Sequence, residues 1–276
     1  MVKKVAIQGF EGSFHQVAAQ QFWGKSIQVI TCATFREVVQ ISANSKESDG
    51  GVMAIENSIA GSILPNYNLL QKAKLQITGE IILQIRQQLL ANPGVTLEAI
   101  REVHSHPMAL QQCLGFLDKY NWKLVETEDT ALSAQHVHKT RSKHIAAIGS
   151  KLAAELYQLE VLAPNIHTMK QNYTRFLILQ REDLKLGIED ADKASVHFET
   201  DHAKGSLAKV LTKIAAADIN LSKLQSFPIP GSHWKYSFHA DMEFGTISQF
   251  NKAIHSIRPL TQGLKIYGIY KKGKTI

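Results

Sequence analysis

The chain has 276 residues and a formal net charge of +7, with 44% hydrophobic and 20% charged residues. This length exceeds the usual size of one domain, so two or three compact units are expected. No apolar run is long enough to cross a bilayer, and no basic stripe interleaves with aromatic residues, so membrane and nucleic acid are not expected partners. Two cysteines and no secretory signal predict a cytoplasmic protein without disulfides.

The first part of the chain alternates predicted strands and helices. Strands are expected over residues 3–8, 27–31 and 52–55, with helices following Ser13 and over 34–43. The break at Gly9 before a helix capped by Ser13 makes a corner where free backbone N–H groups can bind an anion. This alternation predicts a parallel sheet whose ligands bind beyond the carboxyl ends of its strands.

Two further polar corners follow later strands. One comprises Asn57, Ser58, Gly61 and Ser62, after the strand over 52–55. The other is Ser105-His106-Pro107, which opens a helix. Each corner also fits ordinary turn and cap chemistry, but several around one cleft would form a site. A metal site at His104 and His106 is not expected, because no cysteine or acidic residue stands at ligand spacing.

The segment 75–90 mixes polar and apolar residues and is interpreted as a long extended stretch with a bend at Gly79. It is a candidate hinge into a second lobe with strands over 102–105, 123–126 and 144–148. A return near Asn165 would complete a two-lobed clamp with a cleft between the lobes.

The stretch Asn172-Tyr173-Thr174-Arg175-Phe176 stands at the mouth of an apolar strand, where binding or catalytic groups are common. Arg175 can hold a carboxylate or phosphate through two parallel hydrogen bonds. The alternative is a strand end with a surface arginine.

Residues 183–193 are rich in charge and are interpreted as a linker. The remainder, 194–276, has the order βαββαβ of a ferredoxin-like unit, with a turn at 228–231 and a sheet edge suited to pairing with a second copy.

Five ordered motifs resemble those of prephenate dehydratase of the phenylalanine pathway. They span nearly the whole chain: residues 9–14, 56–62, 105–113, 146–157 and 172–176. The resemblance implies an α/β fold in which a two-lobed catalytic domain, like a periplasmic binding protein, precedes an ACT regulatory domain. The expected boundaries are 1–182 for the catalytic domain (lobe one about 1–77 and 168–182, lobe two about 78–167) and 194–276 for the ACT domain.

The same resemblance implies loss of CO2 and water from prephenate to yield phenylpyruvate, without metal or organic cofactor. Thr174 is the residue that the family's motif marks as essential, placed at the leaving hydroxyl, with Arg175 as carboxylate clamp and His106 or Glu80 as helper. The residues expected to bind substrate are Ser13, Asn57, Ser58, Gly61, Ser105, His106, Asn172 and Phe176.

The ACT-like unit departs from the family's pattern. Its effector-binding positions would be Gly205, Ser206, Leu207, Ala208, Asn220, Leu221, Gln225 and Ser226. The family's Glu-Ser-Arg-Pro segment appears as Gln225-Ser226-Phe227-Pro228, so weaker or altered inhibition by L-phenylalanine is expected. A homodimer or homotetramer is expected. The alternatives are an arogenate dehydratase and a non-catalytic sensor of aromatic acids.

Overall fold

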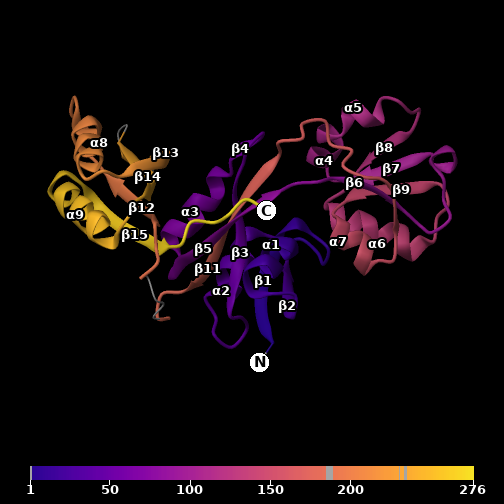
Figure 1. Ribbon diagram of the computed structural model, residues 1–276, viewed down its shortest axis with the longest axis horizontal. Helices are drawn as coiled ribbons and strands as arrows, with labels where there is room; N and C mark the ends of the chain where they lie inside the picture. The colour runs from indigo at the N-terminus through magenta and orange to yellow at the C-terminus, as the bar shows by residue number, and fades with distance from the viewer. Residues whose placement is uncertain (1, 185–188, 230, 233–234) are drawn as a thin grey trace.

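The structure is a computed structural model that describes residues 2–184, 189–229, 231–232 and 235–276. Its strands form three sheets, and Figure 1 shows them side by side with the first sheet in the middle. Within these residues no helix combines the length and apolarity that a bilayer crossing requires.

The first sheet has the strand order β2-β1-β3-β11-β5, with β4 paired to β3. The pairs β1–β2 and β1–β3 are parallel, as predicted, whereas β11 runs antiparallel to both β3 and β5. The strands are β1 (Lys3–Gln8), β2 (Ile27–Cys32), β3 (Gly50–Asn57), β4 (Gly61–Ser62), β5 (Leu75–Gln84) and β11 (Tyr173–Arg181). The helices are α1 (Phe14–Trp23), α2 (Phe35–Ser42) and α3 (Leu64–Lys72). Ser13 and Thr34 cap α1 and α2 through their side chains.

The second sheet has the order β10-β6-β9-β7-β8. Its strands are β6 (Gln88–Ala91), β7 (Glu102–Ser105), β8 (Lys123–Glu126), β9 (Ile145–Gly149) and β10 (Glu160–Ala163). Its helices are η1 (Leu97–Ala99), α4 (Pro107–Gln112), α5 (Leu114–Leu117), α6 (Thr130–Thr140) and α7 (Lys151–Leu156). The single helix expected after His106 is divided in two at Cys113, whose φ of −107° and ψ of 4° are not helical.

The chain crosses between these sheets twice. The first crossing lies between β5 and β6, at residues 85–87, and the second lies between β10 and β11. The expected boundary at residue 78 is wrong, because β5 pairs with β11 from Leu75 to Gln84. Gly79 does not form a hinge; it lies inside β5 opposite Ile178, next to a register shift in the pairing.

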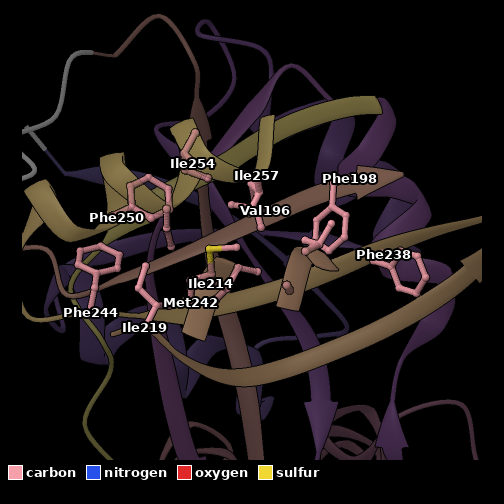
Figure 2. Packing of buried hydrophobic residues seen from close by; sticks show 14 residues of the cluster. Val196, Phe198, Ile214, Ile219, Phe238, Met242, Phe244, Phe250, Ile254 and Ile257 are labelled. Carbon is pink, nitrogen blue, oxygen red and sulfur yellow. The ribbon is translucent and has the colours of Figure 1, made fainter. Parts of the chain in front are cut away.

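The third sheet has the order β13-β14-β12-β15, and its elements follow the predicted βαββαβ order. They are β12 (Lys193–Glu199), α8 (Ser206–Ala216), β13 (Asn220–Pro228), β14 (Tyr236–Glu243), α9 (Ile247–Ile257), η2 (Arg258–Leu260) and β15 (Gln262–Tyr270). Figure 2 shows its core, where Val196, Phe198 and Met242 of the strands meet Ile214 and Phe250 of the helices. Alternation along β12 and β14 places these side chains on one face.

The other face of the third sheet contacts the first sheet, mainly where β15 packs beside β5.

Residues 185–188 of the expected linker and Pro230 of the expected turn lie outside the described residues. Lys193, expected to end the linker, instead begins β12 and is buried. After β15 the chain continues along β5, where the amide of Ile276 donates to the carbonyl of Ile82 (2.9 Å) and thus covers part of a sheet edge.

Candidate active site

A cavity of about 290 Å³ lies between the first and second sheets. Five residues expected from the sequence line it: Ser13, Asn57, His106, Thr174 and Phe176. The other lining residues are Gln8, Phe14, His15, Ala54, Ile85, Gln87, Met108, Ala109, Gln112, Glu128, Asp129 and Thr130. We call this the active-site cavity. No lysine or arginine lines it among the described residues.

The hydroxyl of Thr174 has a fixed orientation. The Asn57 side-chain amide donates from Nδ2 to Oγ1 of Thr174 (3.0 Å) and to Oδ1 of Asn172 (2.8 Å). Oδ1 of Asn57 accepts from the backbone amides of Ile59 and Ala60, which determines the orientation of the amide. Since Thr174 accepts from Asn57, its own proton is available to donate into the cavity.

The N-terminus of α1 supplies backbone donors to the cavity. Ser13 caps this helix by accepting from the amide of Gln16 (3.4 Å), and Phe14 and His15 follow in the first turn. The first amides of a helix have no partner within it, and the dipole adds positive potential. This geometry suits the anion site predicted at this corner, and binding of an anion here stays a prediction.

His106 contributes a donor from the second sheet. Its Nδ1 accepts from the backbone amide of Met108 (3.2 Å) at the start of α4. The ring proton of neutral His106 is therefore on Nε2, which can donate a hydrogen bond.

The aromatic wall of the cavity includes Phe176 and His15. Their rings meet edge to face, with centroids 5.0 Å apart, and His15 also contacts Phe35 at 5.5 Å. Burial lowers the pKa of His15 to about 4, so its imidazole is neutral near pH 7. Nε2 of His15 is buried without a hydrogen-bond partner in the described part of the chain.

Two carboxylates also border the cavity, Glu128 and Asp129. Asp129 caps α6 by accepting from the amides of Ala131 (2.7 Å) and Leu132 (3.0 Å). Burial raises the pKa of Asp129 above its ordinary value. The cavity thus offers acceptors as well as donors to a ligand.

The first lobe, built on the first sheet, contacts the second lobe, built on the second sheet, at the loop between β1 and α1. Ser150 Oγ donates to the carbonyl of Gly12 (2.5 Å), and the Tyr157 hydroxyl donates to the carbonyl of Glu11 (2.8 Å). A Cβ atom at Gly12 would lie 2.9 Å from Cα of Ala153, so only glycine permits this approach. These contacts explain why motifs far apart in the sequence border one cavity.

Arg175 does not lie in the active-site cavity. Successive residues of a strand point to opposite faces, and Thr174 and Phe176 occupy the cavity face. Arg175 instead donates from Nε to Glu80 (2.6 Å), from Nη1 to Asp241 and from Nη2 to the Tyr270 hydroxyl (3.1 Å). The expected carboxylate clamp is wrong, because both carboxylates that Arg175 binds belong to the protein.

Glu80, expected as a proton-donating helper, also lies behind the first sheet. Its fully buried side chain accepts from Arg175 and from Lys193 (3.0 Å). Among the two expected helpers, only His106 borders the cavity.

Other expected substrate-binding residues have structural contacts. Ser58 binds β11, because its Oγ accepts from the amide of Tyr173 (2.9 Å). Ser105 is buried and donates to the carbonyl of Ile148 (2.8 Å). Gly61 pairs with Asn57 on β4. Asn172 donates to Gln112 (3.0 Å) and borders a separate cavity of about 490 Å³ with Ile59, Met108, Leu114 and Met169.

The expected effector residues occupy two separate places on the third sheet. Gly205 to Ala208 lie at the start of α8, and Asn220 follows its other end. The eleven residues of α8, a length of about 16 Å, separate Gly205 from Asn220. Gln225 and Ser226 lie further along β13.

Sequence reasoning missed His15, Gln87, Glu128 and Asp129 as cavity residues. His15 directly follows the predicted glycine corner, and Glu128 and Asp129 follow a predicted strand, so a weak positional signal was present. Gln87 lies at the crossing that was placed too early in the chain. In the described ranges no three His, Cys, Asp or Glu side chains gather as a metal site would require.

Comparison with known proteins shows the family to which this chain belongs. The family model for prephenate dehydratase matches residues 5–184. The chain belongs to the prephenate dehydratase family. The bifunctional chorismate mutase/prephenate dehydratase of Enterobacter agglomerans is 33% identical over 272 residues, covering 97% of this chain and 70% of that protein. Arogenate dehydratase 2 of Petunia hybrida is 34% identical over 282 residues, covering 97% and 71%.

Two solved structures resemble the whole chain. The prephenate dehydratase of Arthrobacter aurescens, in complex with L-Phe, has a TM-score of 0.85 and 26% identity, covering 97% of this chain and 90% of that chain. A structure described as GqqA, a novel type of quorum quenching acylases, has a TM-score of 0.89 and 29% identity, covering 98% of each chain. The two-lobed fold and the third sheet are thus those of prephenate dehydratases.

Proposed function

We propose that this protein is a prephenate dehydratase, a carbon–oxygen lyase that converts prephenate into phenylpyruvate. The observation that carries this proposal is the Thr174 hydroxyl, which accepts from Asn57 and can donate into the active-site cavity. Residues 1–182 would form the catalytic domain and 194–276 the regulatory ACT domain, with the first crossing between the lobes at 85–87.

The reaction breaks two bonds of the substrate ring. The ring carboxylate leaves as CO2, its electron pair enters the ring, and the C–O bond opposite breaks as the ring becomes aromatic. The departing hydroxide takes one proton and leaves as water. Donation from Thr174 stabilises the negative charge that develops on this oxygen, and a buried donor is effective because water does not compete with it.

The remaining cavity residues hold the substrate. The amides of Phe14 and His15 at the α1 N-terminus would bind one carboxylate, and Nε2 of His106 would donate to the second anion or to the leaving oxygen. The rings of Phe176 and His15 would orient the substrate ring. With neither lysine nor arginine among the described lining residues, anion binding would rest on the α1 dipole and on hydrogen-bond donors.

The decisive experiment is to incubate the purified protein with prephenate and measure phenylpyruvate by its absorbance in alkali. We expect turnover by the wild type and a large loss in Thr174→Val. If the folded wild type forms no phenylpyruvate, the proposed function is wrong.

An arogenate dehydratase is the second candidate. Arogenate carries an ammonium group where prephenate has a keto group, and Glu128 and Asp129 border the cavity as possible partners for that charge. The Petunia relative is named for this activity. Assaying both substrates side by side decides, and a larger kcat/KM for arogenate would favour the second candidate.

An acylase is a third candidate, because the structural neighbour GqqA is described as an acylase. One observation supports it: a largely apolar cavity of about 490 Å³ shares Met108 and Gln112 with the active-site cavity. An acyl chain could occupy it. Release of a fatty acid from a long-chain N-acyl amide, measured by mass spectrometry, would support this activity.

We propose that L-phenylalanine regulates the enzyme through the third sheet; the solved complex of the Arthrobacter aurescens protein with L-Phe supports L-phenylalanine as a ligand. Because Gly205 and Asn220 lie at opposite ends of α8, one pocket containing both needs two chains, which supports a homodimer. Gln225-Ser226-Phe227-Pro228 offers no charged side chain, so inhibition should be weaker than where an acidic and a basic residue are present. Tight inhibition at low phenylalanine concentration would contradict this expectation.

A further inference from the structure

Four charged side chains form two ion pairs between the first and third sheets, directly behind the active-site cavity. Arg175 of β11 binds Asp241 of β14. Lys223 of β13 lies with Nζ 2.5 Å from Oε1 of Glu56 on β3, and 2.5 Å from Oγ of Ser62. We call Glu56, Arg175, Lys223 and Asp241 the charge quartet.

Strand pairing within each sheet places the four residues of the charge quartet opposite one another in twos. Arg175 stands opposite Glu56 where β11 pairs with β3. Lys223 stands opposite Asp241 where β13 pairs with β14. Each sheet therefore has a cationic and an anionic side chain opposite each other on adjacent strands. Each cation pairs with the carboxylate of the other sheet, Arg175 with Asp241 and Lys223 with Glu56.

The residue pair next to Arg175 and Glu56 in the β11–β3 ladder is Thr174 and Asn57. Thr174 stands opposite Asn57, one residue from Arg175 and Glu56, and both side chains line the cavity on the other face. The β11–β3 register then shifts between Arg175 and Phe176. The charge quartet therefore lies next to a point where the β11–β3 ladder is irregular.

Three members of the charge quartet are largely shielded from water, and the fourth, Glu56, is partly exposed. The side chain of Asp241 is fully buried, those of Arg175 and Lys223 are 11% and 14% exposed, and that of Glu56 is 32% exposed. Asp241 also accepts from Ser195 Oγ (2.5 Å) and His239 Nε2 (3.2 Å). Although burial alone would raise the pKa of Asp241, the neighbouring Arg175 guanidinium holds it well below its usual range. The carboxylate therefore stays charged across the working pH range.

Burying such charges brings little net stability compared with apolar residues of similar size, but the geometry is directional. A bidentate or forked contact defines the position of a strand more narrowly than apolar packing does. Small displacements of a reacting group reduce turnover strongly.

We propose that the charge quartet positions Thr174 and Asn57 for catalysis, so that turnover depends on docking of the third sheet through these two ion pairs, which lie beside the Lys193–Glu80 pair between the same sheets. Glu56, Arg175, Lys223 and Asp241 act here as positioning residues, since none of them lines the cavity. The inference rests on the proposed dehydratase function.

The test uses the less buried ion pair of the quartet in the full chain. Lys223→Met and Glu56→Gln each remove one charge, and the double variant Glu56→Lys with Lys223→Glu restores the pair with exchanged signs. Lys265→Met is the matched control, because Lys265 also reaches the first sheet's unit (Glu182, 3.6 Å) but contacts no residue next to Thr174 or Asn57. Steady-state kinetics with prephenate and hydrogen exchange of the peptide over 170–180 are measured for each.

We expect kcat to fall roughly tenfold in both single variants with little change in KM, and to recover in the double variant. Hydrogen exchange over 170–180 should accelerate in the same single variants and not in Lys265→Met. Wild-type kcat in a folded Lys223→Met or Glu56→Gln variant would overturn the inference, as would an equal loss in Lys265→Met. If wild type lacks dehydratase activity, the proposed function fails, and unchanged exchange in the single variants separately overturns the positioning role.

Discussion

The Nδ2 atom of Asn57 lies 3.0 Å from the Oγ1 atom of Thr174 and donates to it. This bond joins the end of a parallel strand to an antiparallel strand that arrives more than a hundred residues later. Because the Thr174 oxygen accepts in this bond, the hydroxyl proton of Thr174 is available to donate toward the cavity.

Thr174→Val should lower kcat by roughly 100-fold, because valine keeps the shape and removes the donor. Thr174→Ser should retain most of the activity, since the hydroxyl remains. Phenylpyruvate formation under saturating prephenate measures both. Near-wild-type kcat in a folded valine variant would exclude a chemical role for Thr174.

Arg175→Met should destabilise the fold by about 3–5 kcal/mol, because the fully buried Asp241 would lose its arginine partner and Glu80 would keep only Lys193 as a cationic partner. Urea unfolding monitored by circular dichroism gives the free energy of unfolding. Arg36→Met is the control: Arg36 is exposed, and its loss should change stability by less than about 0.5 kcal/mol. A loss at Arg175 no larger than at Arg36 would contradict the buried network.

Stability should fall on acidification between pH 6.5 and 4 partly because of His15. The unfolded imidazole binds a proton below its ordinary pKa of 6.5, whereas burial lowers the folded pKa to about 4. The unfolded state therefore binds more protons in this window, which costs up to about 1.4 kcal/mol per pH unit. In His15→Gln this part of the slope should disappear, and in His255→Gln, at an exposed position, it should remain. Equal slopes in both variants would be the contrary result.

Gly12→Ala should be more harmful than Gly24→Ala, although both glycines have nearly the same φ, 90° and 88°. The left-handed backbone costs about 1–2 kcal/mol in either variant. Only at Gly12 would the new methyl also meet Ala153 across the lobe contact; nothing lies within 4 Å of a Cβ at Gly24. Unfolding midpoints and kcat of the two variants measure the difference, and identical losses would mean that the lobe contact is unimportant.

The sequence predicted local elements well where periodicity and caps agree. The strand Lys3–Gln8, the Ser13 cap and the βαββαβ order of the last unit all follow from alternation, helical spacing and cap chemistry. The division of β5 from β6 could not be read in the same way, because polar and apolar residues mix through 75–90. Its cause is long-range: β5 continues until its pairing with β11 ends.

The error at Arg175 has a different origin. Two neighbours in a strand cannot both face one cavity, so the alternation that placed Thr174 there already excluded Arg175. What the sequence could not supply was the identity of its partners, since Asp241 lies 66 residues further along the chain. The same holds for Glu128 and Asp129, which reach the cavity only through the arrangement of the two lobes.

The two ion pairs of the charge quartet also bear on domain exchange. A C-terminal unit taken from a relative would dock on this catalytic domain only if it presents a carboxylate and an amine at the positions of Asp241 and Lys223. Chimeric enzymes that keep Glu56 and Arg175 should therefore be designed with an aspartate and a lysine at the positions of Asp241 and Lys223, rather than by joining fragments at the linker alone.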